Sequence, residues 1–492
     1  MARFKTVAGS GYGNPYIDSL IWGGRVWDET AGPIKVHFVA PFDKNGDLSD
    51  EAINASDFHN GTHGRLEDQS GDQLMSWNAR EVGAFVDTYS KYASVCGLKF
   101  DFSDLAHADI ALWKADLGFL GSEDSVVLGV HEPVGAMIVG SDGKSVLPNQ
   151  LWGYFNGAAD GWQSLSPGGD GRNTVVHEIG HSLGLAHPHD GGSQADATTF
   201  PGVAQSDDRG ILGLNQGIWT VMSYNAGLDS APHDKEFGAQ SALGALDIKA
   251  LQVLYGANYG NALGDDVYTL PTTNAAGTGW SCIWDAGGID TINGAGETGA
   301  VVIDLREATL DPADPNAAGF VSAPFGVAGG FTIANGAVIE NAIGGAGNDV
   351  LGGNLASNNL SGGGGADMMV AGDGRDTLTG GAGNDTFIFN LRATKAGTDR
   401  ITDMKPKADV IWLDNIAFKT LGRKGSVDVP AKVNPKMFCV GLKAKDKDDH
   451  IIYDKFHGVL YYDDDGTGKH AEVAVANLSK NLKLAASDFR VV

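Results

Sequence analysis

Residues 176–188 have the sequence VHEIGHSLGLAHP, and the N-terminal half of the chain is organised around them. His177 and His181 are four residues apart, so a helix places both imidazole rings on one face. Gly184 lets the chain leave that helix through a backbone conformation that a residue with a Cβ adopts poorly. The turn brings His187 round as a third nitrogen ligand. Three protein ligands with a fourth position open for water are the arrangement of catalytic rather than structural zinc.

Two further features fit the same centre. Glu178 lies beside the first histidine and can reach a metal-bound water without itself binding the metal. Residues 220–224, TVMSY, have the form of a methionine turn. The extended pattern H-E-x-x-H-x-x-G-x-x-H is the signature of the metzincin metalloproteases. Pro188 after the third histidine, with Met222 and Tyr224 in the turn, is similar to the serralysins, which are secreted bacterial zinc endopeptidases.

This resemblance implies a role for each residue of the centre. The implied zinc ligands are His177, His181, His187 and Tyr224. Glu178 would take a proton from the attacking water and return it to the leaving amine, and Tyr224 would swing away from the metal to stabilise the oxyanion. Met222 would form a hydrophobic floor beneath the zinc. His189 departs from the family, which usually has glycine there, and we interpret it as a residue of the rim.

The composition limits the classes of partner and the compartment. The 492 residues carry a formal net charge of −26, so nucleic acid and anionic membranes are poor partners and a divalent cation is the expected one. The three cysteines, Cys96, Cys282 and Cys439, are far apart and form no disulfide framework. The first residues lack the apolar run of a secretory signal peptide, and no stretch approaches 18 uninterrupted apolar residues.

Hydrophobic periodicity predicts the elements around the centre. We expect helices over 77–95 and 241–255, and strands over 34–39, 108–113, 128–130 and 150–155. An edge strand within 126–156 is the candidate for binding a substrate backbone, as in metzincins. Asn173 or Thr174 is the expected N-cap of the helix that bears the histidines. His59 and His63 are also four residues apart, but 60–62 forms a poor helix and we expect no metal there.

An internal repeat of period nine follows near residue 344. Three blocks are regular, at 344–351, 362–369 and 380–387, and a fourth begins at Ala371. The block at 353 is degenerate, with Asn358 where aspartate is expected. The pattern matches the RTX nonapeptide, in which glycine turns point carbonyls inward, aspartate adds a carboxylate and an apolar residue fills the core. Stacked turns of this kind offer calcium the six to eight oxygens that it prefers, whereas a flexible Gly/Asp linker would not keep a strict register.

Further stretches resemble those that bracket the serralysin roll, at 264–268, 284–291 and 338–343. With the repeat blocks they give the residues expected at calcium sites: Gly264, Asp266, Asp285, Gly287, Gly288, Asp290, Glu340, Gly345, Gly347, Asp349, Gly363, Gly365, Asp367, Gly372, Gly374, Asp376, Gly381, Gly383 and Asp385. Residues 463–466, DDDG, could bind another cation or form a solvated turn.

The sequence therefore predicts an α+β metzincin catalytic domain followed by an all-β domain with a parallel β-roll. The expected divisions are an N-terminal segment over 1–70, a zinc protease domain over 71–258, a calcium-binding RTX region over 259–390 and a β-rich C-terminal region over 391–492. Whether the first segment is a removable pro-segment is left open. The final residues, SDFRVV, are of the kind that address RTX proteins to type I secretion exporters, although they could also be an ordinary last strand.

The expected function is a secreted, extracellular endopeptidase that hydrolyses peptide bonds in proteins, with one catalytic Zn²⁺ and several structural Ca²⁺. The expected partners are protein or peptide substrates, a type I secretion exporter and a proteinaceous inhibitor, and association with the cell surface is left open. The alternative is a calcium-dependent surface or adhesive protein with a vestigial zinc site, and the complete ligand set with Glu178 weighs against it. A second alternative keeps the enzyme but restricts it to processing a single partner.

Overall fold

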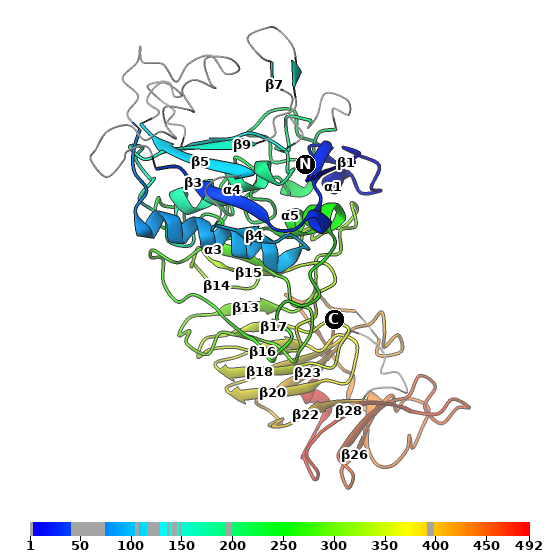
Figure 1. The fold of residues 1–492 in the computed structure, drawn as a ribbon. Coiled ribbons are helices and arrows are strands. Elements are labelled where there is room, and N and C mark those ends of the chain that lie inside the picture. Colours follow the sequence, from blue (N-terminus) through cyan, green and yellow to red (C-terminus); the bar gives the residue numbers. More distant parts are fainter. Residues whose placement is uncertain are drawn as a thin grey trace.

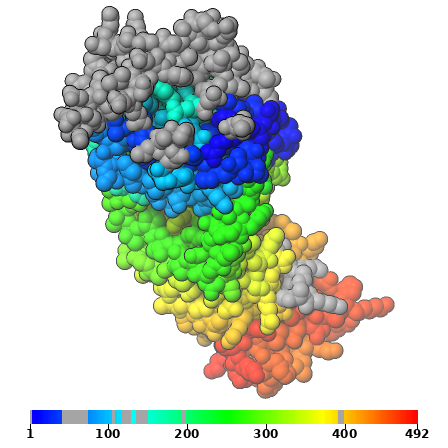
Figure 2. Space-filling model, in the orientation of Figure 1, coloured from blue at the N-terminus to red at the C-terminus, as the bar shows by residue number. Residues whose placement is uncertain are grey.

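The computed structural model describes residues 3–40, 74–103, 108–116, 128–134, 138–139, 145–146, 150–191, 198–390, 398–422 and 424–492. The molecule is elongated, with the residues around the histidine helix at one end and the C-terminal residues at the other (Figures 1 and 2). The buried apolar side chains of the two parts form one continuous cluster. His59 and His63 lie outside the described residues.

The N-terminal part contains a five-stranded sheet in the order β4-β3-β5-β9-β6. Its strands are β3 (Ile34–Phe38), β4 (Phe100–Asp101), β5 (Ile110–Ala115), β6 (Gly129–His131) and β9 (Leu151–Asn156). Neighbouring strands are parallel except β6, which runs antiparallel to β9 at the edge. All four predicted strands are confirmed within two residues, and β6 is an edge strand in the predicted interval. A separate antiparallel pair consists of β7 (Ile138–Val139) and β8 (Ser145–Val146).

Three long helices accompany this sheet: α3 (Ala79–Val95), α4 (Asp170–Ser182) and α5 (Ala245–Tyr255). Helix α3 contacts β4 and α4, α4 contacts β6, and α5 contacts α3 and the short helix α1 (Pro15–Ser19). Asn78 and Glu81 form a capping box that begins α3. The predicted helix over 77–95 is confirmed, and Phe85 and Tyr89 are buried, but Val86 is 38% exposed. The helix therefore turns Val86 away from the core.

Two predicted helix starts are wrong. The N-cap of α4 is Gly169, so Asn173 and Thr174 lie inside the helix. A Cβ at Gly169 would lie 2.3 Å from Ser164 O, which explains the glycine, and the Thr174 hydroxyl donates instead to Asp170 O at 3.0 Å. Helix α5 begins at residue 245 rather than 241, because the preceding residues pair with a strand: Ser241 N–H donates to Trp280 O.

The described residues before 40 share the core of the histidine helix. They form β1 (Phe4–Val7), α1 (Pro15–Ser19), β2 (Gly24–Trp27) and the 3₁₀ turn η1 (Glu29–Ala31). The Trp27 indole N–H donates to Ser182 O at 2.8 Å, and Trp22 N–H donates to Gly184 O at 2.9 Å. β3 lies inside the five-stranded sheet. The division at residue 70 and the removal of a pro-segment stay predictions.

The chain then enters two long sheets whose repeat strands are parallel. One contains β10 (Val267–Thr269), β12 (Thr291–Asn293), β16 (Asn341–Ile343), β18 (Asn359–Gly364), β20 (Thr377–Ala382) and β22 (Asp399–Ile401). The other contains β13 (Val301–Asp304), β17 (Val350–Gly352), β19 (Met368–Val370), β21 (Thr386–Phe389) and β23 (Val410–Leu413). Figure 1 shows these strands stacked below α3.

Successive nine-residue blocks supply the two sheets alternately. Leu360 pairs with Leu378 in one sheet and Met369 with Phe387 in the other, so a full turn takes 18 residues. These apolar side chains and the equivalent Leu351 are completely buried between the sheets. The predicted parallel β-roll with an apolar residue in each block's core position is therefore confirmed.

The last hundred residues extend the same sheets. They contain β24 (Ala431–Lys432), β25 (Phe438–Val440), β26 (Ile451–Asp454), β27 (Val459–Tyr462), β28 (Val473–Asn477) and β29 (Phe489–Val491). Shorter elements complete the fold: β11 (Trp280–Ile283), β14 (Ala323–Pro324), β15 (Gly330–Ile333), η2 (Ile211–Gly213), η3 (Pro435–Met437) and η4 (Ala486–Asp488). β29 is parallel to β23 and buries Phe489 and Val491. None of the helices in the described parts of the chain has the length and hydropathy needed to span a bilayer.

Candidate active site

Helix α4 and the turn after it bring three imidazoles together. His177 and His181 stand on one face of the helix, and Gly184 turns the chain with a φ of 95°. His187 Nε2 then lies 3.0 Å from the Nε2 atoms of both His177 and His181. The predicted convergence of the three rings is therefore present in the structure.

The opposite nitrogen of each ring is fixed by an acceptor. Nδ1 of His177 lies 2.8 Å from Val221 O, Nδ1 of His181 lies 3.0 Å from Leu185 O, and Nδ1 of His187 lies 2.8 Å from a carboxylate oxygen of Asp190. An Nδ1–H that donates to these acceptors leaves the Nε2 lone pairs facing one another. Burial lowers the pKa of His177 to about 3, with a further contribution from His187, so that ring is neutral. Three converging imidazoles fit zinc in ligand type and number.

A buried carboxylate holds the methionine turn beneath these rings. Met222 is fully buried, and a Cβ at Gly180 would lie 2.8 Å from its Sδ, so glycine lets the turn approach the helix. Asp247, at the start of α5, accepts from the backbone N–H of Val221 at 2.8 Å and from the Thr220 hydroxyl at 2.6 Å. Since Val221 O faces His177 Nδ1, Asp247 supports the ligand through one intervening residue. Sequence reasoning gave Asp247 no role as a support of the centre.

Glu178 lies between the helix and the edge strand β6. Its side chain is buried, and a Cβ at Gly129 would lie 3.0 Å from its Cγ. Burial raises the pKa of Glu178 to about 8, although a hydrogen bond from the His131 backbone lowers it in part. The raised pKa brings this carboxyl closer to the range in which a group can exchange protons near neutral pH.

Tyr224 packs beside His177 and His187 and contacts the rim residue His189. Its ring centroid lies 4.8 Å from that of His187 and 5.7 Å from that of His177. His189 stacks on His187 at 5.1 Å and lies at the same distance from Tyr224. Tyr224 is 57% exposed, so its side chain has room to move. Burial of part of the ring raises the pKa of its hydroxyl, and the charges of Glu178 and Asp190 raise it further.

The acidic residues predicted before the repeat also come together. Carboxylate oxygens of Asp266, Asp285 and Asp290 lie within 4.8 Å of one another. Asp290 Oδ1 accepts from Asp266 N–H, and Glu340 Oε2 accepts from Asp290 N–H, both at 2.8 Å. A Cβ at Gly288 would lie 1.9 Å from Gly264 O, so these two predicted positions touch through their backbones.

The repeat aspartates form two columns. In one, Asp349 N–H donates to Asp367 Oδ1 at 2.9 Å, and Asp367 N–H donates to Asp385 Oδ1 at 3.2 Å. In the other, Asn358 N–H donates to Asp376 Oδ1 at 2.8 Å. The second oxygens of Asp367, Asp376 and Asp385 are buried and have no hydrogen-bond partner among the described residues. Burial raises the pKa of Asp367 and Asp376 to about 7.

Columns of carbonyl oxygens run beside the carboxylates. A Cβ at Gly363 would lie 2.3 Å from Gly345 O, and one at Gly365 would lie 2.0 Å from Gly347 O. The same close approach recurs at the next turns, at Gly372, Gly374, Gly381 and Gly383. All these glycines have positive φ, so both the conformation and the space exclude a side chain. The stacked turns thus bring carbonyl and carboxylate oxygens of the predicted glycines and aspartates together, and calcium binding at these residues stays a prediction.

Sequence reasoning missed several acidic residues that continue these columns. Asp399 Oδ1 accepts from Asp376 N–H and Asp409 Oδ1 accepts from Asp385 N–H. Asp403 accepts from Gly380 and Gly381 N–H. These residues lie 22 to 24 positions from their partners rather than 18, so a search for period nine stops before them.

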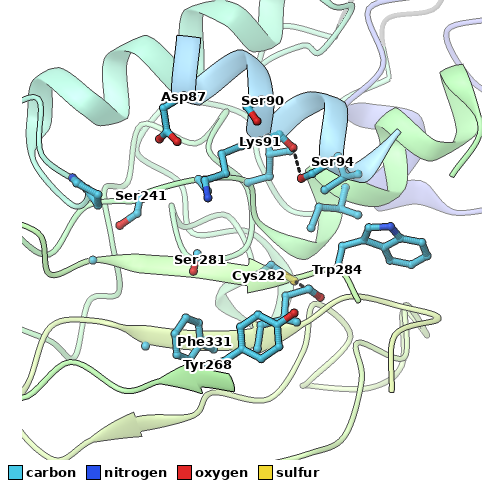
Figure 3. A pocket seen from close by; sticks show the side chains of 18 of the residues that line it. Asp87, Ser90, Lys91, Ser94, Ser241, Tyr268, Ser281, Cys282, Trp284 and Phe331 are labelled. Carbon is cyan, nitrogen blue, oxygen red and sulfur yellow. Dashed lines mark hydrogen bonds between the residues drawn. The ribbon is translucent and has the colours of Figure 1, made fainter. Parts of the chain in front are cut away.

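Two other features lie away from both centres. Asp464 and Asp465 of the predicted DDDG turn cluster with His470 in the C-terminal part. A cavity of about 860 Å³ lies between α3 and the strands β10, β11 and β15. Figure 3 shows Asp87, Ser90 and Lys91 of α3 on one wall and Cys282 and Phe331 on the other. None of the three zinc-site histidines lines it. Cys96 and Cys439 are buried as expected, whereas Cys282 is partly exposed.

Comparisons with known proteins agree with this architecture. Residues 245–429 match the family described as Peptidase M10 serralysin C terminal. Metalloprotease AprA of Pseudomonas entomophila is 39% identical over 284 residues, which are 54% of this chain and 54% of that protein. Serralysin G of Dickeya chrysanthemi is 30% identical over 331 residues, 59% of this chain and 65% of that protein. Metallopeptidase AprA of Pseudomonas marginalis is 38% identical over 200 residues, 38% of each protein. The aligned parts thus span between about a third and two thirds of these relatives.

A solved structure, the AlgE6R3 subunit of the Azotobacter vinelandii mannuronan C5-epimerase, aligns with 30% of this chain and 71% of that chain. Its identity is 25% and its TM-score is 0.17, which is too low to support an argument about the fold. The histidine helix and its methionine turn have the arrangement expected of a metzincin. The family match and the relatives show that this chain is similar to metalloproteases of the serralysin type, and its C-terminal half carries the nonapeptide repeats.

Proposed function

We propose that this chain is a secreted zinc-dependent endopeptidase whose C-terminal β-roll is stabilised by calcium. The observation that carries the proposal is the convergence of three Nε2 atoms beside the buried carboxyl of Glu178. His177, His181 and His187 would hold zinc, with Tyr224 as a fourth protein ligand at rest. Zinc bound there would supply a Lewis acid that acidifies water and polarises a peptide carbonyl.

The side chains of the chain itself would carry the proton and position the substrate. Glu178 accepts a proton from the water that attacks the scissile carbonyl and returns it to the leaving amine. Its pKa near neutrality suits both halves of this transfer. The Tyr224 hydroxyl donates to the oxyanion of the tetrahedral intermediate, and its exposure allows it to rotate between its two roles.

The edge strand β6 supports a mode of substrate binding. Among the described residues, no strand pairs with its outer side, and His131 of this strand contacts Glu178 through its backbone. An extended peptide that adds to this edge would run beside the carboxyl group. Hydrogen bonds to the peptide backbone would give affinity without restricting the sequence, which suits a protease of broad specificity.

The test measures zinc content and casein cleavage on the calcium-loaded protein. Wild type should contain one zinc and cleave casein, whereas Glu178→Ala should keep the zinc and lose cleavage. Wild-type-like cleavage by this variant would contradict the mechanism. A wild-type protein that binds calcium but no zinc and cleaves nothing would favour the alternative of a surface protein with a vestigial centre.

We further propose that calcium binding drives the roll to fold outside the cell. The orphaned carboxylate oxygens and stacked carbonyls support this role, because their repulsion opposes folding until a cation is bound. A loose C-terminal half at low calcium would suit passage through a type I secretion exporter. The expected partners are that exporter, protein or peptide substrates and a proteinaceous inhibitor. Limited proteolysis tests the proposal. Secreted and intracellular fractions of the protein are first incubated with and without calcium.

A further inference from the structure

The turn between β12 and β13 stacks on the first turn of the repeat. Asn293 pairs with Ile343 at one end and Val302 pairs with Val350 at the other. Ala346 N–H donates to Glu297 O at 2.8 Å, which joins the two turns directly. The turn is two residues longer than a repeat turn, so it has no nonapeptide pattern, and sequence reasoning assigned it no ligand.

The carbonyl columns of the repeat nevertheless continue into this turn. A Cβ at Gly345 would lie 2.5 Å from Glu297 O, just as one at Gly363 would lie 2.3 Å from Gly345 O. A Cβ at Gly347 would lie 2.3 Å from Gly299 O. Glu297 and Gly299 therefore occupy the carbonyl positions of the repeat, one turn before its recognisable start.

The aspartate of the column is replaced by valine at this turn. Val301 N–H donates to Asp349 Oδ1 at 2.8 Å, as Asp349 N–H donates to Asp367 Oδ1 one turn later. The backbone link is thus kept, but Val301 contributes no carboxylate. A cation at this turn would need a negative ligand from another position.

The side chain of Glu297 supplies that carboxylate. Glu297 is 8% exposed, and its Oε1 is buried without a hydrogen-bond partner among the described residues. No lysine, arginine or histidine of the described chain forms an ion pair with it. Asp349 is buried as well, and two buried acidic groups call for a cation or a proton.

We propose that Glu297 is a ligand of a further calcium ion, bound between the 294–300 turn and the first repeat turn. The carboxylate of Asp349 and the stacked carbonyls of both turns complete a set of hard oxygen ligands. The ion closes the calcium ladder at the end nearest the histidine helix and joins this irregular turn to the repeats. The inference rests on the proposed binding of calcium by the roll.

The test uses crystals of the wild-type, full-length protein with terbium exchanged for calcium. Anomalous difference density should appear at the repeat turns and also within about 2.6 Å of Glu297 Oε1. Density at the repeat turns without a peak at Glu297 would overturn this inference alone. The absence of density at every turn would overturn the calcium role of the roll as well.

Counting bound calcium in solution gives a second measurement. Glu297→Gln keeps the shape of the side chain and removes its charge, so this variant should bind one calcium fewer per molecule than wild type. Glu472→Gln, which makes the same change of charge in the C-terminal part, should bind as many as wild type. An unchanged count in the folded Glu297→Gln variant, with circular dichroism equal to wild type, would contradict the site. If that variant does not fold, the terbium experiment on wild type decides the question.

Discussion

The histidine centre and the β-roll both gather metal ligands, but they hold them differently. Each imidazole of the centre has its Nδ1 beside a protein oxygen, so the ring is oriented without a metal. In the roll, the second carboxylate oxygens of Asp367, Asp376 and Asp385 are buried without partners. The protein thus satisfies the first set of ligands itself and leaves the second set to be satisfied by an ion.

The difference implies different consequences of metal loss. A centre whose ligands are already hydrogen-bonded should keep its shape without zinc. A roll in which the second oxygens of these buried carboxylates lack a donor should lose its folded state without calcium, because binding energy there is folding energy.

Removing calcium should therefore have the largest effect. In EGTA the full-length chain should lose most of the β signal of the roll in circular dichroism, and millimolar calcium should restore it. The physical cause is the repulsion among stacked aspartates and the loss of ligands for the carbonyl columns. Identical spectra with and without calcium would show that the two regions do not differ in this way.

Removing zinc in excess calcium should abolish peptide cleavage and leave the fold intact. A zinc-selective chelator such as phenanthroline serves as the reagent, with casein hydrolysis and circular dichroism measured on the same sample. Added zinc should restore activity without a refolding lag. Unfolding on zinc loss would mean that the hydrogen bonds to Nδ1 do not suffice to hold the rings.

Asp247→Asn tests whether Asp247 supports the histidine centre through Val221 of the methionine turn. The substitution weakens the hold on Val221, whose carbonyl faces His177, so zinc affinity should fall about 10- to 100-fold. Competition with a chromogenic zinc chelator measures this. Asp311→Asn, a change of an exposed aspartate in a roll loop, is the matched control. Unchanged zinc affinity would leave Asp247 a purely structural role.

Asn358→Asp compares, within the roll, a position that satisfies its own hydrogen bonds with the aspartate positions that do not. The Asn358 amide donates to Glu340 O at 3.2 Å and to Asn354 Oδ1 at 2.9 Å, so this position satisfies itself without an ion. An aspartate there loses both donors. The calcium-free roll should be destabilised by about 1–2 kcal/mol, and calcium should bind more tightly. Calcium titrations followed by circular dichroism should show a steeper transition, and an unchanged titration would contradict the expectation.

Glu132 provides the smallest effect, as a buried carboxyl outside both metal centres. Burial raises its pKa to about 7, against a hydrogen bond from Trp152 N–H that lowers it. A raised folded-state pKa favours the protonated form, so its contribution to stability is full below about pH 4.5 and is lost as pH rises through 7. In saturating calcium, Glu132→Gln should reduce the drop in Tm between pH 5.5 and pH 8.5. Equal drops in Tm for the variant and wild type would contradict this contribution of Glu132 to the pH dependence of stability.

Local spacing was enough to predict the principal residues of both regions. The positions of His177, His181 and His187 follow from helical geometry and one glycine, and the roll follows from a period of nine. The partners of these residues could not be predicted in the same way. Asp247 reaches the centre from helix α5, which begins more than sixty residues after His181. Gly169 caps the histidine helix α4 because a side chain there would meet Ser164 O.

The acidic residues at the two ends of the repeat also could not be predicted from local spacing. Asp399 and Asp409 continue the aspartate columns after longer connections, and Glu297 begins one with a different residue at a different position. A sequence period detects only turns of equal length. The stacking of strands in space tolerates unequal turns, because register is set by the sheets and not by the loops.

The alternation of strands between the two sheets also constrains how this protein can change over evolution. Loss or gain of a single nine-residue unit would send every later strand to the opposite sheet and exchange the partners of β22 and β23. Duplication or deletion in steps of 18 residues keeps each strand on its own side. Lineages that lengthen or shorten the roll should therefore differ by whole coils, and protein engineers who graft or trim it should cut at the same interval.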